Sequence, residues 1–166
     1  MLVLSKITYS TCTVTGCIFT GNTAIWCGAI SNSGTCNVIN CTFTGNTATY
    51  YGGAIANEYG NLNITGSTFT GNTATNTYAD GGAIDNQGIL TVNNCTFTGN
   101  ANEYGYGGAI YSFSGTCNVN GCTFTGNTVN QEGGAIYSFS GTCNVTNSTF
   151  INNTAEYNAG AIENYI

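Results

Sequence analysis

The sequence contains no proline, no histidine and a single basic residue, Lys6. Only 5% of its 166 residues are charged, and the net charge is −6; charged residues make up about a quarter of an ordinary globular protein. Affinity for nucleic acid and attachment to anionic lipid both depend on Lys and Arg. The composition therefore predicts no nucleic-acid partner and no electrostatic attachment to a membrane.

Long apolar runs are also missing. No stretch approaches the ~18 apolar residues of a membrane-spanning helix, so no membrane insertion is expected. The opening, MLVLSKITYS, is too short for a complete signal peptide. We expect either that a signal has been removed or that the chain is a piece of a longer protein. A nearly uncharged surface rich in Asn and Thr favours an extracellular or cell-surface location, and 12% aromatic residues argue against disorder.

Three short motifs recur six times each. The Phe of the string CTFTGNTA returns at intervals of 24, 26, 28, 27 and 26 residues. It lies at Phe19, Phe43, Phe69, Phe97, Phe124 and Phe150. The Ile of GAI lies at Ile30, Ile55, Ile84, Ile110, Ile136 and Ile162. Apolar pairs two residues apart lie at Cys12/Val14, Cys36/Val38, Leu62/Ile64, Leu90/Val92, Cys117/Val119 and Cys143/Val145. Residues 1–166 are therefore predicted to form one repeat domain.

The repeat unit predicts an all-β fold. Each of its three segments alternates apolar and polar residues, which is typical of strands, and Gly and Asn at the junctions suit tight turns. One coil alone buries too little apolar surface to offset the entropy of ordering about 26 residues. Stacked coils share backbone hydrogen bonds and columns of like side chains. We therefore predict a parallel β-helix of about six three-sided coils.

Stacking turns each repeated position into a column. If Phe points inward, its neighbours point outward and form a Thr array. The array comprises Thr42, Thr44, Thr68, Thr70, Thr96, Thr98, Thr123 and Thr125, with Ile18 and Ile151 at its ends. Buried Asn must be hydrogen-bonded, and stacked amides satisfy one another. One predicted ladder is Asn22, Asn46, Asn72, Asn100, Asn127 and Asn153; a second is Asn32, Asn57, Asn86, Ser112, Ser138 and Asn164.

Eight of the nine cysteines fall into two further columns. These are Cys12, Cys36, Cys117 and Cys143, and then Cys17, Cys41, Cys95 and Cys122. Leu or Ser replaces Cys in the other repeats, which suggests small, half-buried filler. Free thiols and vertical disulfides such as Cys12–Cys36 both fit stacked coils. Zinc is disfavoured because the chain lacks His and close Cys pairs. Cys27 lies outside both columns, and the odd total of nine leaves at least one thiol unpaired.

The alternation of FTGN and GGAI resembles the FxxN and GGAI repeats of chlamydial polymorphic outer-membrane proteins and the adhesin-like repeat proteins of methanogenic archaea. The resemblance extends from about Cys12 to Ile162. It implies a right-handed parallel β-helix on the cell surface that serves in adhesion, and it brings no catalytic residues.

The loop between FTGN and GGAI varies most, and loops of this kind carry function on solenoids. Its aromatic and acidic residues are Trp26, Tyr50, Tyr51, Tyr78, Asp80, Glu103, Tyr104, Tyr106, Glu132, Glu156 and Tyr157. They could bind surface glycans, since aromatic rings stack on sugars, and the acids could hold Ca²⁺. The alternative is that they are solvated loop tips. Asp80, Asp85 and Glu58 could supply a carboxylate pair for glycoside cleavage. Without a concentrated acidic cluster or His, we expect no enzyme and no required cofactor.

Two other functions remain open. The Thr array resembles the TxT faces of β-solenoid ice-binding proteins, although Thr also suits exposed strand positions. The chain spans close to a whole number of coils and has no evident caps, so copies could stack head to tail into a fibre. The sequence thus predicts a non-enzymatic, extracellular structural or adhesin-like module that could assemble head to tail into a fibre. Ice binding and glycan binding are the alternatives.

Overall fold

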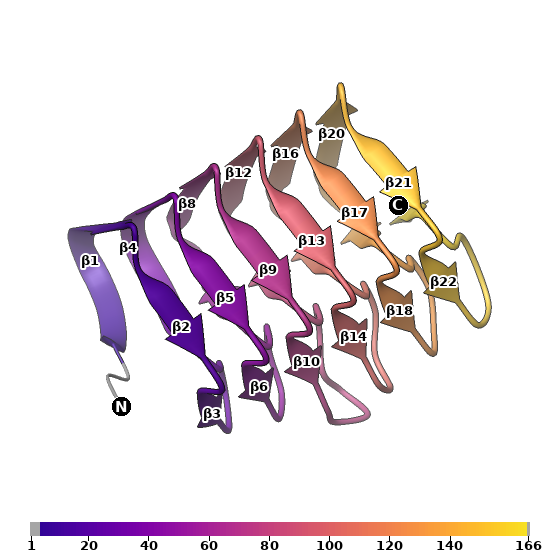
Figure 1. Cartoon of the computed structure of the whole chain (residues 1–166), viewed down its shortest axis with the longest axis horizontal. Coiled ribbons are helices and arrows are strands. Elements are labelled where there is room, and N and C mark those ends of the chain that lie inside the picture. The colour runs from indigo at the N-terminus through magenta and orange to yellow at the C-terminus, as the bar shows by residue number, and fades with distance from the viewer. Residues whose placement is uncertain (1–3, 166) are drawn as a thin grey trace.

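The computed structural model describes residues 4–165, which form strands and turns and no helix. The chain winds into stacked coils that advance steadily from the N-terminal to the C-terminal side (Figure 1). In that view the near strands run downward while the chain advances to the right, which is the sense of a right-handed coil. All strand pairs are parallel, and the residues that pair on neighbouring coils lie about one repeat apart in the sequence. The predicted β-helix is confirmed. No helix in the described part of the chain could span a bilayer.

The TFT segments form one six-stranded sheet, the first face of the coil. Its strands are β2 (Ile18–Thr20), β5 (Thr42–Thr44), β9 (Thr68–Thr70), β13 (Thr96–Thr98), β17 (Thr123–Thr125) and β21 (Thr149–Ile151). The Phe of each strand points inward, and rings on adjacent coils stack 4.7–4.9 Å apart with planes within 5°. Phe43, Phe69, Phe97 and Phe124 are completely buried. The Phe column therefore forms the centre of the core.

A second six-stranded sheet follows each TFT strand after one turn, and the sequence pattern did not predict it. Its two-residue strands are β3 (Thr23–Ala24), β6 (Thr47–Ala48), β10 (Thr73–Ala74), β14 (Ala101–Asn102), β18 (Thr128–Val129) and β22 (Thr154–Ala155). Two residues are too short to show an alternating pattern, so only the ladder pairing between coils reveals these strands. Each coil thus has four strand segments rather than three.

The GAI and CxV segments belong to one larger sheet. Its strands are β1 (Leu4–Thr15), β4 (Ile30–Ile39), β7 (Ile55–Asn57), β8 (Asn61–Thr65), β11 (Ile84–Asn86), β12 (Ile89–Asn93), β15 (Ile110–Phe113), β16 (Thr116–Asn120), β19 (Ile136–Phe139), β20 (Thr142–Thr146) and β23 (Ile162–Tyr165). In the coil of β4 the GAI and CxV segments form one continuous strand, which pairs with both β7 and β8 of the next coil. In later coils a sharp corner separates the two segments.

The first Asn ladder is continuous, as predicted. In each interior coil the Asn Nδ2 donates to the Asn Oδ1 of the following coil and to a Phe carbonyl of the preceding coil. For Asn100 these bonds reach Asn127 at 2.9 Å and Phe69 at 3.0 Å. Its Oδ1 accepts the backbone N–H and the Nδ2 of Asn72 at 3.0 and 2.9 Å. The ladder therefore satisfies every polar atom of the buried amide.

The second ladder is only partly formed. Asn32 donates to Asn57, and Asn57 to Asn86, at 2.7 and 2.8 Å. Asn86 then donates to the Ser112 hydroxyl at 3.0 Å. The next position, Ser138, is fully buried and its hydroxyl has no hydrogen-bond partner in the structure. A Ser side chain is too short to span the coil spacing, so the ladder breaks where Ser replaces Asn.

The second cysteine column has a role that sequence reasoning missed. The Sγ of Cys95 accepts the backbone N–H of Ser67, and the Sγ of Cys122 accepts that of Cys95, at 3.3 and 3.4 Å. The hydroxyls of Ser67 and Ser148 accept the N–H of Cys41 and Cys122 in the same way, at 3.0 and 3.1 Å. Cys and Ser therefore interchange because both present a small acceptor to the preceding coil.

Candidate functional site

The Thr array lies on the outer side of the TFT sheet. Thr42, Thr68, Thr96 and Thr123 are Cα partners along one column, and Thr44, Thr70, Thr98 and Thr125 along the other. Most of these side chains are half-buried between their neighbours above and below, and Thr96 is exposed. The columns end at Ile18 and Ile151, both exposed. The predicted outward array is thus present and in register over four coils.

The variable loops bring some of the predicted aromatic and acidic residues together and leave others apart. Trp26 stacks on Tyr50 and Tyr51 at ring-centroid distances of 4.9 and 5.7 Å, and its indole is 57% exposed. Tyr104 and Tyr157 lie on exposed loop tips, as do Glu103 and Glu156. The Oε1 of Glu132 accepts the amide of Asn158 at 2.7 Å. The loop-tip interpretation therefore describes four of these positions.

A cavity of about 230 Å³ gathers three of the predicted residues, Tyr78, Asp80 and Tyr106, at adjacent loops. Thr77, Gly105 and Tyr111 complete its lining. Tyr111, which the sequence analysis did not single out, follows Ile110 and points outward from β15. Its ring lies 6.4 Å from that of Tyr106, and Tyr106 lies 4.6 Å from Tyr137. The cavity is thus walled by tyrosine rings with one carboxyl among them.

Two asparagines fix the loops around this cavity. The position of Asn102 is occupied by Ala or Val in each of the other five coils. Asn102 is buried, and its Nδ2 donates to the carbonyls of Ala79 and Tyr106 at 2.8 and 2.9 Å, which joins the two loops. Asn76 organises the earlier loop, since its side-chain oxygen accepts the Tyr78 N–H at 3.2 Å. This loop belongs to the 28-residue interval, the longest in the chain.

Gly105 lets the two loops approach each other. A Cβ on Gly105 would lie 1.6 Å from the carbonyl oxygen of Ala79, far inside contact distance. The backbone is paired here as well, because Asp80 and Tyr106 form an isolated parallel bridge. The cavity is therefore a consequence of departures from the repeat: a longer loop, an Asn in place of Ala, and a Gly at the contact.

The carboxyls at this site have no cationic partner among residues 10–165, which contain no Lys, Arg or His. Burial raises the pKa of Asp80 to about 7. Asp85 is fully buried beside Tyr111 on the neighbouring strand, and burial, together with the nearby charges of Asp80 and Glu58, raises its pKa well above the usual range. Only the amide of Gln87 reaches its Oδ2, at 3.3 Å, and its Oδ1 has no partner. Burial and these acids also raise the pKa values of Tyr51 and Tyr111.

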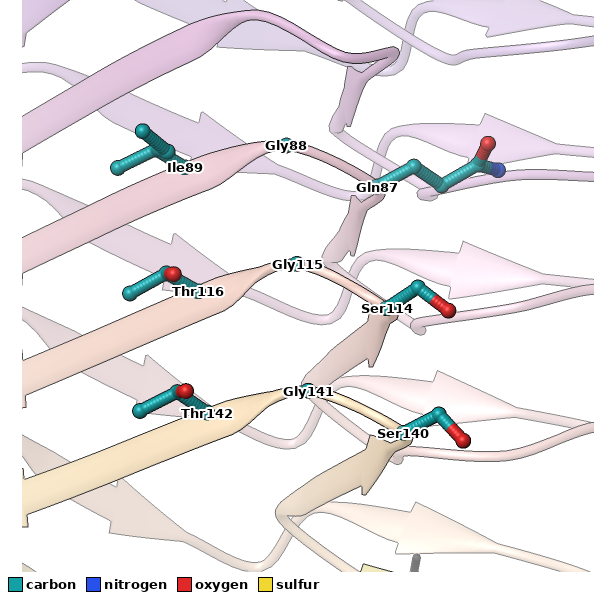
Figure 2. Close-up of a pocket in the computed structure, with 9 residues that line it drawn as sticks. All are labelled: Gln87, Gly88, Ile89, Ser114, Gly115, Thr116, Ser140, Gly141 and Thr142. Atoms are coloured by element: carbon teal, nitrogen blue, oxygen red, sulfur yellow. The ribbon is translucent and has the colours of Figure 1, made fainter.

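An open groove of about 540 Å³ follows the corner between the GAI and CxV segments of the later coils. Figure 2 shows Gly88, Gly115 and Gly141 in a row, with Gln87, Ser114 and Ser140 on one side and Ile89, Thr116 and Thr142 on the other. A Cβ on Gly115 would lie 2.2 Å from the Gly88 carbonyl oxygen, so the corner requires glycine. Uncharged residues line the whole groove.

The cysteines differ in their surroundings: a hydrogen bond with Cys95 lowers the pKa of the Cys122 thiol to about 7, and Cys117 lowers that of Cys143. All nine are free thiols in this structure. Cys12 and Cys36 are direct Cα partners, as are Cys117 and Cys143. Cys27 is buried and bonded to the Ile30 carbonyl at 2.9 Å, and burial raises its pKa to about 12, which makes a thiolate scarce at neutral pH.

The acids considered for Ca²⁺ do not form a metal site. Within the described part of the chain, no three Cys, Asp or Glu side chains come close enough together to hold a metal ion. Glu132 and Glu156 lie on later coils than Asp80 and are separated from it by the Tyr106 loop. The observed arrangement thus favours tyrosine-lined binding over cation coordination by several carboxylates.

Comparison with known proteins identifies the repeat. The family model of the Chlamydia polymorphic membrane protein repeat matches residues 40–58, 66–87 and 121–138. Each matched segment includes one FTGN string and the GGA that follows it. No curated protein and no solved structure matches the chain. The resemblance to the chlamydial repeats is confirmed for these three segments, each of which is similar to the Chlamydia polymorphic membrane protein repeat.

Proposed function

We propose that this chain is a non-enzymatic, surface-exposed adhesin-like rod. The observation that carries the proposal is the unbroken stacking of repeats of a membrane-protein family. Inward positions are occupied by the core and the ladders, so recognition falls to the outward columns and loops. The exposed Trp26 cluster and the Tyr78–Tyr106 cavity supply aromatic surfaces of the kind that stack on sugar rings. An outer-membrane or cell-surface location accords with the family name.

Two measurements test the proposal: the binding of coated beads to cell-surface ligands, and the labelling of intact cells by antibody. Beads coated with the folded chain should bind immobilised cell-surface glycans or matrix proteins more strongly than beads coated with the heat-unfolded chain. Antibody raised against the chain should label intact source cells without permeabilisation. Equal binding of both bead types, together with labelling only after permeabilisation, would rule out an adhesin on the surface.

Ice binding is a second candidate, favoured by the register of the Thr array. Its columns repeat at the coil spacing, and Thr residues two apart along a strand give the second spacing of a regular lattice. If the array binds ice, Thr70→Tyr abolishes thermal hysteresis, whereas Asn63→Ala on another face leaves it unchanged. A chain without thermal hysteresis before mutation excludes this function.

Self-association is a third candidate, supported by the parallel stacking itself. A coil without a neighbour on one side leaves ladder groups unpaired and apolar columns uncovered there, so a second copy could continue the pattern. Filaments in electron micrographs, and a light-scattering mass that rises with concentration, are the expected results. A monomer that persists at high concentration contradicts it.

A further inference from the structure

The tyrosine-walled cavity contains one carboxyl group, that of Asp80, and no cationic side chain. No Lys, Arg or His occurs after Lys6, so no side chain in residues 7–166 can form an ion pair with Asp80 or Asp85. Among the described residues, no donor bonds to the Asp80 carboxyl, which lies in the cavity lining. Asp85, beside Tyr111 on the neighbouring strand, keeps one oxygen without a partner although it is fully buried. Desolvation disfavours the ionised form of the Asp80 carboxyl, and a bound cation would favour that form and gain its attraction.

The walls of the cavity select the kind of cation. Tyr78, Tyr106 and Tyr111 line the cavity. The π face of a tyrosine ring attracts an ammonium group within about 6 Å of the ring centroid. A metal ion instead requires several oxygen ligands at short distance, and the described residues contain no such group. The volume of about 230 Å³ also exceeds the size of a bare ion and suits a small organic group.

We propose that this cavity binds a primary ammonium group, with Asp80 as its counter-ion and the rings of Tyr106 and Tyr111 as its walls. Such a group occurs on an unacetylated amino sugar and on a lysine side chain. The inference deepens the adhesin-like function proposed above, because it names the chemistry that one of its surfaces recognises.

The proposal is tested by calorimetric titration of the full chain with four probes: glucosamine, lysine amide, glucose and N-acetylglucosamine. The two ammonium compounds should bind at least tenfold more tightly than the two neutral sugars. The tighter of the two ammonium compounds identifies the source of the group. If neither binds, or if glucose binds as tightly as glucosamine, the proposal is wrong.

Two pairs of variants locate the binding. Asp80→Asn keeps the shape of the side chain and should weaken glucosamine or lysine amide at least tenfold. Glu132→Gln removes an acid from the same loop position two coils later and should leave the affinity unchanged. Tyr106→Leu should weaken binding about three- to thirtyfold, whereas Tyr157→Leu, on an exposed tip, should not.

These outcomes separate the cavity from the wider function. Unchanged thermal unfolding of Asp80→Asn shows that lost affinity is not lost folding. Full affinity in a folded Asp80→Asn chain overturns the proposal even if the beads adhere. Ammonium binding without bead adhesion supports the cavity and counts against the adhesin.

Discussion

Replacing Asn100 by Ala should strongly destabilise the β-helix, because the structure assigns four side-chain hydrogen bonds to this one amide. It donates to Phe69 and Asn127, and it accepts two bonds from Asn72. Phe69, Asn72, Asn100 and Asn127 are all fully buried. After truncation the Asn72 backbone N–H has no acceptor, and the Phe69 carbonyl loses a donor.

The expected magnitude follows from these two groups. A buried polar group left without a partner costs about 1–3 kcal/mol, so the free energy of unfolding should fall by about 3–5 kcal/mol once the lost amide contacts are included. A domain of this size loses about 2–4 °C in melting temperature per kcal/mol. The melting temperature of Asn100→Ala should therefore drop by on the order of 10 °C.

Circular dichroism on heating and in urea measures both quantities, and Asn63→Ala is the matched control. Asn63 also donates to an Asn on a neighbouring coil, at 3.1 Å to Asn37, but this pair is exposed to water. Its loss should cost less than about 1 kcal/mol. If both variants lose the same small amount of stability, the buried amide ladder does not hold the coils together and the reasoning fails.

Three further changes test other parts of the structure. Ser138→Asn should raise the free energy of unfolding by about 1 kcal/mol, because an amide there can continue the second ladder; a lower melting temperature contradicts this. The raised pKa values of Asp80 (about 7) and Asp85 mean that the folded chain holds protons which the unfolded chain releases. Stability should therefore fall as pH rises from about 4 to 8, and Asp85→Asn should flatten this fall by raising the melting temperature at pH 8 more than at pH 4.5. Gly105→Ala should push the Ala79 loop away and lower the melting temperature more than Gly99→Ala, where no atom lies within 4 Å of the added Cβ.

Much of the fold could be predicted because each strong signal came from repetition. The Phe, Ile and Val positions recur six times, and this recurrence indicates which side chains face inward. The sixfold recurrence of Asn three residues after Phe likewise predicted the ladder that includes Asn72 and Asn100. The two-residue strands could not be predicted, since Thr47–Ala48 carries no periodicity of its own and pairs only through its neighbours.

The site was only partly predictable because it depends on departures from the repeat. Tyr78, Asp80 and Tyr106 were flagged by residue type within a variable loop, and the structure brings them to one cavity. Tyr111 was missed because it occupies a strand position rather than a loop. Asn102 was missed because a single Asn in place of Ala looks neutral in sequence, although it joins both loops. Comparing each repeat with the consensus at that column could have indicated it.

The Asn ladder also has a direction. Between successive Asn residues, the Nδ2 and the backbone N–H of one coil donate to the Oδ1 of the coil that follows. A cut between two coils would therefore leave the Asn donors of these bonds on one surface and the Oδ1 that accepts them on the other. Opposite surfaces fit together and like surfaces do not, so a whole repeat can be inserted or deleted without altering the bonding at the join. The length of such a rod is then free to vary by single repeats while its polarity is preserved.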